Sequence, residues 1–206
     1  MSNYHNKINN FISSVFKKMK KFAQKIFKGS FQFVFKQIYG KIFYDPNNLR
    51  SDKVSINEIR NGNIINYYSK NYQVYKIKNG RIYTDNVENV AIIDGNKIID
   101  NISYQQILGN LVKANKNSSL EKGTPRIKRK FNGRVLSLAQ GASGNSNYYH
   151  WLFDLLPKIK LYSEIYRLND LDYLYAFKLK KFQFESLIPL GLEKIKIIDI
   201  KRDRHI

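Results

Sequence analysis

Residues 134–157 read RVLSLAQGASGNSNYYHWLFDLLP, and this stretch decides the fold that we predict for the chain. It opens with a short apolar run at 134–139, passes through the glycine-containing segment 140–146, and then takes the apolar spacing of a helix. A buried strand joined by a short loop to a helix is the first part of a βαβ unit. The sequence therefore predicts the start of a parallel sheet here.

The same order continues downstream. We expect a strand at 172–177, a helix at 181–190 that ends near Gly191, and another strand at 194–200. Connections this short join parallel strands through the helices that cover them. The predicted fold class is α/β, with residues 131–206 forming the start of a doubly wound domain.

The helix predicted over 147–168 has two faces when its residues are placed about 100° apart. One face is an apolar stripe of Tyr148, Leu152, Leu155, Ile159, Tyr162 and Tyr166, and the other is a polar stripe of Asn147, His150, Asp154 and Lys158, with Trp151 at the border. His150 and Asp154 are four residues apart and are therefore neighbours on the helix surface. An imidazole transfers protons near neutral pH, and a carboxylate beside it can orient the ring.

Each of these residues also has a purely structural interpretation. Asn147 can cap the helix, His150 can be a partly buried structural histidine, and Trp151 can belong to the core. Pro157 lacks a backbone donor and should kink or end the first part of the helix.

The segment before this helix is a candidate ligand loop. Gly144 and Asn145 lie between a strand and a helix, where open parallel sheets bind ligands. Free N–H groups at the helix start can bind an anion or a sugar hydroxyl. The segment has neither the G-x-G-x-x-G pattern nor the P-loop lysine arrangement, so its spacing assigns no nucleotide.

The string NYYHWLFDLLPK at 147–158 resembles the signature that opens the catalytic region of glycosyltransferase family 61, which includes bacterial proteins labelled as capsular-polysaccharide biosynthesis enzymes. The resemblance covers roughly residues 70 to 200. It implies an inverting enzyme of the two-Rossmann-domain type called GT-B, of which this chain would be the first, acceptor-side half. Asn147, His150, Trp151 and Pro157 match the signature, and Asp154 stands where family members often carry an acidic residue.

The resemblance also implies roles. His150 would be the catalytic base or an acceptor contact, Asp154 its orienter and Trp151 a platform for a sugar, with Gly144, Asn145 and Asn147 as further substrate contacts. A nucleotide sugar would be the co-substrate and a glycan the acceptor, with no cofactor and no metal.

The second Rossmann-like domain of the family has no counterpart after Ile206. We therefore expect a fragment whose donor-binding half could come from a separate chain. The alternative is a non-catalytic membrane- or glycan-binding remnant.

The first 45 residues form a basic segment, with nine lysines and no acidic residue before Asp45. Apolar residues step by threes and fours through it, which predicts an amphipathic helix. Residues 1–43 could bind an anionic membrane surface. The alternatives are a helix docked on the protein's own core and an arm that binds a partner.

Residues 46–125 look rich in β-structure. Asn79-Gly80 lies between apolar runs at 72–77 and 81–84, and Asp94-Gly95-Asn96 lies between runs at 90–93 and 97–99. These turn sequences predict two hairpins of a small antiparallel sheet. Residues 115–129 are polar and basic, which predicts a linker or loop, and Arg126, Lys128, Arg129 and Lys130 follow one another closely enough to contact an anionic group.

The formal net charge of +20 suggests nucleic acid as a partner, but no recognisable nucleic-acid motif accompanies it, so we do not favour this interpretation. The absence of cysteine excludes disulfides and thiolate metal sites.

Asp170-Leu171-Asp172 matches the D-x-D pattern of metal-dependent glycosyltransferases, yet two acids so spaced are common and we predict no metal site there. No apolar stretch reads as a signal peptide or a spanning helix, which favours a cytoplasmic protein that is peripheral at the inner face of the membrane.

Overall fold

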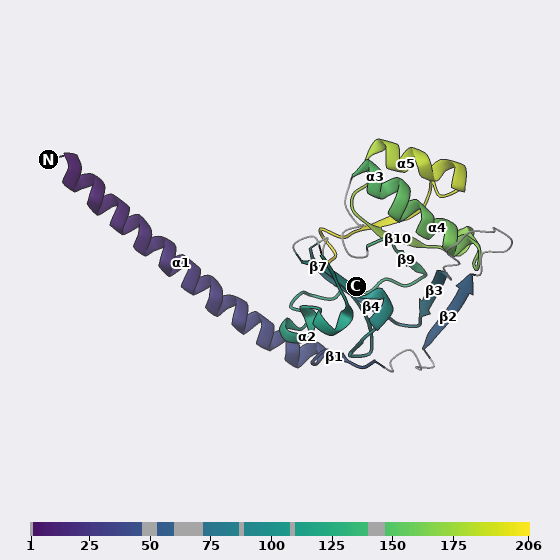
Figure 1. Cartoon of the computed structure of the whole chain (residues 1–206), viewed down its shortest axis with the longest axis horizontal. Coiled ribbons are helices and arrows are strands. Elements are labelled where there is room, and N and C mark those ends of the chain that lie inside the picture. Colours follow the sequence, from purple (N-terminus) through teal and green to yellow (C-terminus); the bar gives the residue numbers. More distant parts are fainter. Residues whose placement is uncertain (1, 47–52, 60–71, 87–88, 108–109, 140–146) are drawn as a thin grey trace.

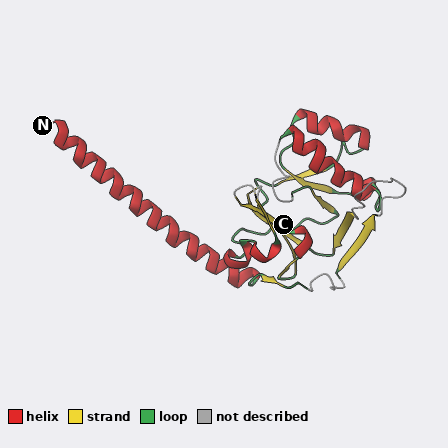
Figure 2. Cartoon of the chain, viewed as in Figure 1, coloured by secondary structure: helices red, strands yellow, loops and turns green. Residues whose placement is uncertain are grey.

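The computed structural model describes residues 2–46, 53–59, 72–86, 89–107, 110–139 and 147–206 (Figures 1 and 2). The chain is a mixed α/β protein. A long N-terminal helix leads into a body that contains an antiparallel sheet, a separate β-ribbon, and a small parallel sheet covered by helices.

The parallel sheet has three strands in the order β11-β10-β9. They are β9 (Val135–Ser137), β10 (Tyr173–Ala176) and β11 (Lys196–Asp199). Leu174 of the central strand β10 is in register with Leu136 on one side and Ile197 on the other. The three strands predicted from residues 134–200 are confirmed, and all run parallel.

Helices connect these strands. The first connection contains α3 (Tyr148–His150), the π-helical turn η5 (Trp151–Leu155), α4 (Leu156–Ser163) and the 3₁₀ turn η6 (Leu168–Asp170); the second contains α5 (Lys181–Leu187) and the 3₁₀ turn η7 (Ile188–Leu190). Gly191 has a φ of 70° and ends the turn η7 in the left-handed conformation that glycine adopts without strain. Leu138, Trp151, Leu155, Ile159, Leu174 and Leu187 form the core between helices and sheet.

The antiparallel sheet precedes the parallel one in sequence. Its six strands are β1 (Phe43–Tyr44), β4 (Arg81–Asn86), β5 (Asn89–Asp94), β6 (Lys97–Ile98), β7 (Tyr104–Ile107) and β8 (Asn110–Val112). All neighbouring strands pair antiparallel except β1, which pairs with β6 in parallel. The hairpin predicted at Asp94-Gly95-Asn96 is confirmed, because Asp94 pairs with Lys97 and Ile93 with Ile98. Two short helices, η2 (Asp100–Ile102) and η3 (Ala114–Lys116), lie within and after this sheet.

The hairpin predicted at Asn79-Gly80 is wrong. The strand before it, β3 (Tyr72–Ile77), pairs with β2 (Val54–Ile59) in a separate two-stranded ribbon, and the strand after it, β4, pairs with β5. Asn79 turns the chain with a φ of 56°, but the turn leads from one sheet to another. The other edge of β4 is also filled, because Ile82 and Ile206 exchange backbone hydrogen bonds of 3.0 Å each.

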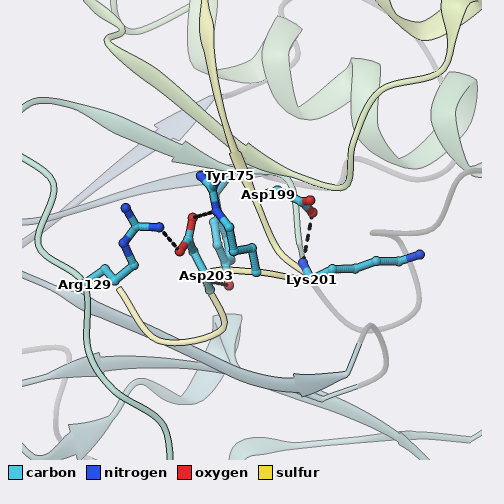
Figure 3. Close-up of polar contacts among 6 residues, drawn as sticks. Arg129, Tyr175, Asp199, Lys201 and Asp203 are labelled. Atoms are coloured by element: carbon cyan, nitrogen blue, oxygen red, sulfur yellow. Dashed lines mark hydrogen bonds and ion pairs between the residues drawn. The ribbon is translucent and has the colours of Figure 1, made fainter.

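The C-terminal segment connects the two sheets through its backbone, which contacts Tyr175 of β10 and pairs with Thr84 and Ile82 of β4, and it contains a buried carboxylate (Figure 3). The Asp203 side chain is fully buried and accepts hydrogen bonds from Arg129 Nη1 at 2.5 Å and Arg202 Nε at 3.2 Å. The Tyr175 hydroxyl in β10 donates to the backbone oxygen of Asp203 at 2.9 Å. The Asp199 side chain at the end of β11 accepts a hydrogen bond from the backbone N–H of Lys201. After this turn the chain runs back to β4.

The two sheets share one hydrophobic core. Val90, Ile92 and Ile99 of the antiparallel region pack with Tyr175 and Ile198 of the parallel sheet. The two segments predicted from the sequence as separate regions, 46–125 and 131–206, therefore pack directly against each other.

The segment predicted as a linker or loop, 115–129, is partly ordered as a helix and packs on the sheet. It contains most of η3 and all of α2 (Ser119–Lys122). Asn117 is buried and its side-chain amide donates to the Val90 oxygen at 3.2 Å. This hydrogen bond ties the segment to β5.

Helix α1 (Ser2–Tyr39) projects away from the body (Figure 1). Among its described side chains, Val15, Met19, Phe22 and Ile26 are exposed, whereas Tyr39 stacks on Phe35 and packs against His205. One alternative from the sequence was that this helix docks on the protein's own core. Among the described side chains of α1, only those in its last turns do so. No helix in the described part of the chain is long and apolar enough to cross a membrane.

Candidate functional site

The candidate site lies at the start of α3, the first helix after strand β9 of the parallel sheet. Helix α3 begins just after Asn147, whose side-chain oxygen accepts the Tyr149 N–H at 2.8 Å. Asn147 is therefore a helix cap, which was the structural alternative for this residue. Gly144 and Asn145, the predicted ligand loop, lie outside the described residues.

His150 and Asp154 are in direct contact. His150 Nδ1 lies 2.5 Å from Asp154 Oδ2, and the two side chains are 32% and 39% exposed. Because an ionised carboxylate only accepts hydrogen bonds, this contact favours the tautomer with the proton on Nδ1. The lone pair of Nε2 is then the free basic position of the ring, and the half-exposed ring can meet a ligand from solvent.

Lys158 extends the same polar stripe and was given no role from the sequence. Its ammonium group donates to the Leu138 backbone oxygen, 3.3 Å away at the end of the first parallel strand. Burial lowers the pKa of Lys158 to about 8, and the negative charge of Asp154 opposes this shift. A cation thus follows Asp154 four residues further along the same polar stripe, and this spacing was the signal that could have identified it.

The helix departs from α-geometry at the predicted position. The Leu156 N–H bonds to the Trp151 oxygen, five residues back, and closes the π-helical turn η5. Pro157 follows in the first turn of α4. The prediction that Pro157 would kink or end the first part of the helix corresponds in the structure to a change of helix type, from the π-turn η5 to α4, just before the proline.

Trp151 is a core residue. Its side chain is fully buried and its indole N–H donates to Ser186 Oγ at 2.8 Å. The ring offers no face to a ligand, so the structure does not support the predicted sugar platform and favours the core alternative. Trp151 lies one helical turn before the buried Leu155, so the apolar stripe extends far enough to include it.

Two aromatic side chains beside His150 are exposed instead. Tyr149 and Phe153 are 62% and 63% exposed, and their ring centroids are 4.8 Å apart. The Tyr149 ring also meets the His150 ring edge-on at 5.8 Å. Tyr148, which was predicted to pack on the sheet, is 61% exposed and contacts Phe182. At about 100° per residue Tyr149 and Phe153 fall on the face away from Leu155 and beside His150, so helical spacing was the signal that could have identified this aromatic surface.

The Asp170-x-Asp172 pattern serves the fold. Asp170 pairs with Arg134 Nη1 at 2.9 Å, and Asp172 accepts the Arg134 backbone N–H at 2.7 Å. Both acids precede β10, at the amino end of the sheet, whereas ligands of open parallel sheets bind at the carboxyl end. Within the described ranges, no cluster of three or more His, Cys, Asp or Glu side chains could hold a metal ion.

The arrangement has the parts needed for proton transfer to or from a hydroxyl. It combines an oriented imidazole, a carboxylate bonded to one ring nitrogen, a half-buried ammonium, and exposed aromatic rings beside the imidazole. In comparisons with known proteins, no family model, no curated protein and no solved structure matches the chain.

Proposed function

We propose that the chain activates the acceptor hydroxyl in a nucleotide-sugar-dependent, inverting glycosyltransferase. The observation that carries this proposal is the contact between His150 Nδ1 and Asp154 Oδ2, which leaves His150 Nε2 as an oriented base. The resemblance at 147–158 supplies the reaction class. Three parallel strands in sequential order with helical connections are compatible with a Rossmann-like, acceptor-side half of a GT-B enzyme.

In the proposed reaction, His150 Nε2 takes the proton of a glycan hydroxyl as that oxygen attacks the anomeric carbon of the donor. The bond from the anomeric carbon to the diphosphate breaks, and the nucleoside diphosphate leaves with the bonding electron pair. Asp154 holds the imidazole and stabilises its charged form. Tyr149 and Phe153 provide apolar ring surfaces against which an acceptor sugar can pack.

The test offers a panel of activated sugars together with mixed glycan acceptors. Release of nucleoside diphosphate is measured for the UDP- and GDP-sugars, and release of nucleoside monophosphate for the CMP-sugars. His150→Gln and Asp154→Asn should each lower turnover, by about 100-fold or more for the base. Glu164→Gln is the matched control, because Glu164 also pairs with a residue four positions away, Lys160, on an exposed part of the same region. Turnover in His150→Gln equal to that in the control would remove His150 as the base.

A second candidate function, binding to an anionic membrane surface, rests on helix α1. On a helical projection, one arc of about 60° holds exposed Val15, Met19, Phe22, Ile26 and Phe33, and a neighbouring arc of about 80° holds Lys18, Lys21, Lys25, Lys28 and Lys36. Apolar side chains beside a lysine-rich face are typical of helices that lie in the lipid interface. Such binding would place the protein at the inner face of the membrane, whether or not it catalyses transfer.

Vesicle cosedimentation tests this second function. The double variant Phe22→Ser and Ile26→Ser should weaken binding to vesicles that contain phosphatidylglycerol by at least about tenfold, since each side chain contributes roughly 1.5–3 kcal/mol when buried. Gln24→Ser, on the same helix but outside the apolar arc, is the control. Equal binding of the double variant and the control would exclude the apolar face as the contact surface. If the complete panel of sugar donors gives no turnover, the catalytic proposal fails and this one is unaffected.

A further inference from the structure

A polar pocket at the base of α1 contains two cations. It has a volume of about 310 Å³ and is lined by Asn79, Arg81, Gly95, Asn96 and Lys128. Two turns of the chain form its rim, the one at Asn79 with a φ of 56° and the one at Gly95 with a φ of 57°. The pocket lies outside the site at His150 and draws on different elements.

Arg81 is the buried charge of this pocket. Its side chain is held in place, with Nη2 bonded to Asn96 Oδ1 at 3.0 Å and Nη1 to the Tyr39 backbone oxygen at 3.4 Å. Arg81 is 8% exposed, and its Nε is buried without a hydrogen-bond partner among the described residues. Burial lowers its pKa, which reflects the cost of holding a cation away from water.

Lys128 adds a second positive charge at the same pocket. Its ammonium group lies 5.7 Å from the centroid of the Tyr39 ring, and its backbone N–H donates to the Tyr39 hydroxyl at 2.9 Å. Burial lowers its pKa first, and the charges of Arg81 and Lys130 lower it further. The two cations are therefore close enough to repel each other.

No carboxylate forms an ion pair with either cation in the described part of the chain. Arg129 and Arg134, by contrast, pair with Asp203 and Asp170. Asp94, the acid next to Gly95 in the pocket's rim, is buried and has contacts of its own. A buried guanidinium without a carboxylate is costly unless an anion from outside balances its charge.

From this unbalanced pair of cations we infer that the pocket of Asn79, Arg81, Gly95, Asn96 and Lys128 binds a phosphate ester. A guanidinium presents its donors as a planar fork, an ammonium supplies a mobile point charge, and two amide side chains offer further donors, which together suit a tetrahedral dianion. Gly40, with a φ of 79°, allows the chain to pass against the Asn96 side chain, where a Cβ would clash with the amide nitrogen. This inference does not depend on the proposed transfer reaction.

The phosphate group can come from a soluble ester or from a lipid headgroup. Tyr39, the last residue of α1, touches both Arg81 and Lys128, so the pocket lies at the base of the helix with the exposed apolar arc. A lipid headgroup could therefore reach it from a membrane on which α1 rests.

Titration calorimetry with inorganic phosphate and with glycerol 3-phosphate tests the soluble source. Cosedimentation with phosphatidylcholine vesicles that carry phosphatidic acid or phosphatidylserine tests the headgroup. Lys128→Met should weaken binding by about tenfold or more, because the variant loses a charged hydrogen-bond donor to the phosphate. Lys178→Met is the control, since it removes the same charge from an exposed site.

Asn79→Gly provides a second variant that should still fold, because glycine accepts the positive φ at this position. It should weaken phosphate binding severalfold through loss of one amide donor. If the two variants lose binding only to the soluble ligands, the natural ligand is a free phosphate ester. If they lose binding only to vesicles that carry phosphatidic acid, the natural ligand is a lipid headgroup. The inference is overturned if Lys128→Met and Asn79→Gly match Lys178→Met in every arm, or if the wild-type chain binds none of the phosphates.

Discussion

Acidification should weaken the fold through His205. This side chain is fully buried between the rings of Tyr39 and Tyr83, with centroids 4.9 and 5.7 Å away. Its Nδ1 lies 3.0 Å from the Arg126 backbone oxygen, which requires a proton on Nδ1, and its Nε2 is buried without a hydrogen-bond partner among the described residues. The neutral ring fits this environment, and a second proton would have no acceptor.

The sign and size of the effect follow from the pKa. Burial lowers the pKa of His205 from 6.5 to about 4, the Arg126 oxygen opposes this, and the charges of Arg81 and Lys128 lower it further. Between these two pH values the unfolded chain binds a proton that the folded chain does not, so stability falls as the pH falls below 6.5. The expected loss is about 2 kcal/mol between pH 7.5 and pH 5, approaching about 3 kcal/mol below pH 4.

Urea denaturation followed by the fluorescence of Trp151, which is the single tryptophan, measures this loss. His205→Asn is the comparison, because its amide can still donate to the Arg126 oxygen but does not titrate. The variant should start less stable at neutral pH and lose about 2 kcal/mol less than the wild type on acidification. NMR titration of His205 in the wild-type chain gives its pKa directly. Equal losses in the two proteins, or a folded-state pKa near 6.5, would refute the reasoning.

Two further predictions concern stability near the candidate site. Ser186→Ala should cost about 1–3 kcal/mol of unfolding free energy, measured in urea, because the buried Trp151 indole N–H loses its acceptor; an unchanged midpoint would mean that the N–H finds another partner. Gly133→Ala should cost about 1–3 kcal/mol by thermal unfolding, because Gly133 has a φ of 130° and an added Cβ would lie 2.5 Å from Asp172 Oδ2. Gly29→Ala is its control, since a Cβ there meets nothing within 4 Å and the helix should be unharmed or slightly stabilised.

The parallel sheet was predictable because its signals are local. Short apolar runs, a glycine at the end of a helix and short connections each specify an element within a few residues of sequence. All three strands lie within the predicted ranges, and the contact between His150 and Asp154 follows from helical spacing. These features needed no information from distant parts of the chain.

The antiparallel region was harder because its pairing is decided at long range. Asn79-Gly80 has the sequence of a hairpin turn, yet both edges of β4 are occupied by other segments. One edge pairs with β5, and on the other edge Ile82 pairs with Ile206 of the C-terminal segment. With both edges of β4 filled, β3 must pair elsewhere, and β2 provides the edge. A turn sequence reports the bend of the chain and carries no information about which strands compete for an edge.

The site itself combines regular helical spacing with one irregular turn. Trp151, Leu155 and Ile159 follow one another at four-residue steps and are all buried, so the core side of the helix is set by spacing that the sequence already shows. Tyr148, which a regular helix would place on the sheet, lies before the π-turn η5 and is exposed. His150 lies between a carboxylate four residues further along the chain and the exposed rings of Tyr149 and Phe153, and this arrangement also follows from helical spacing.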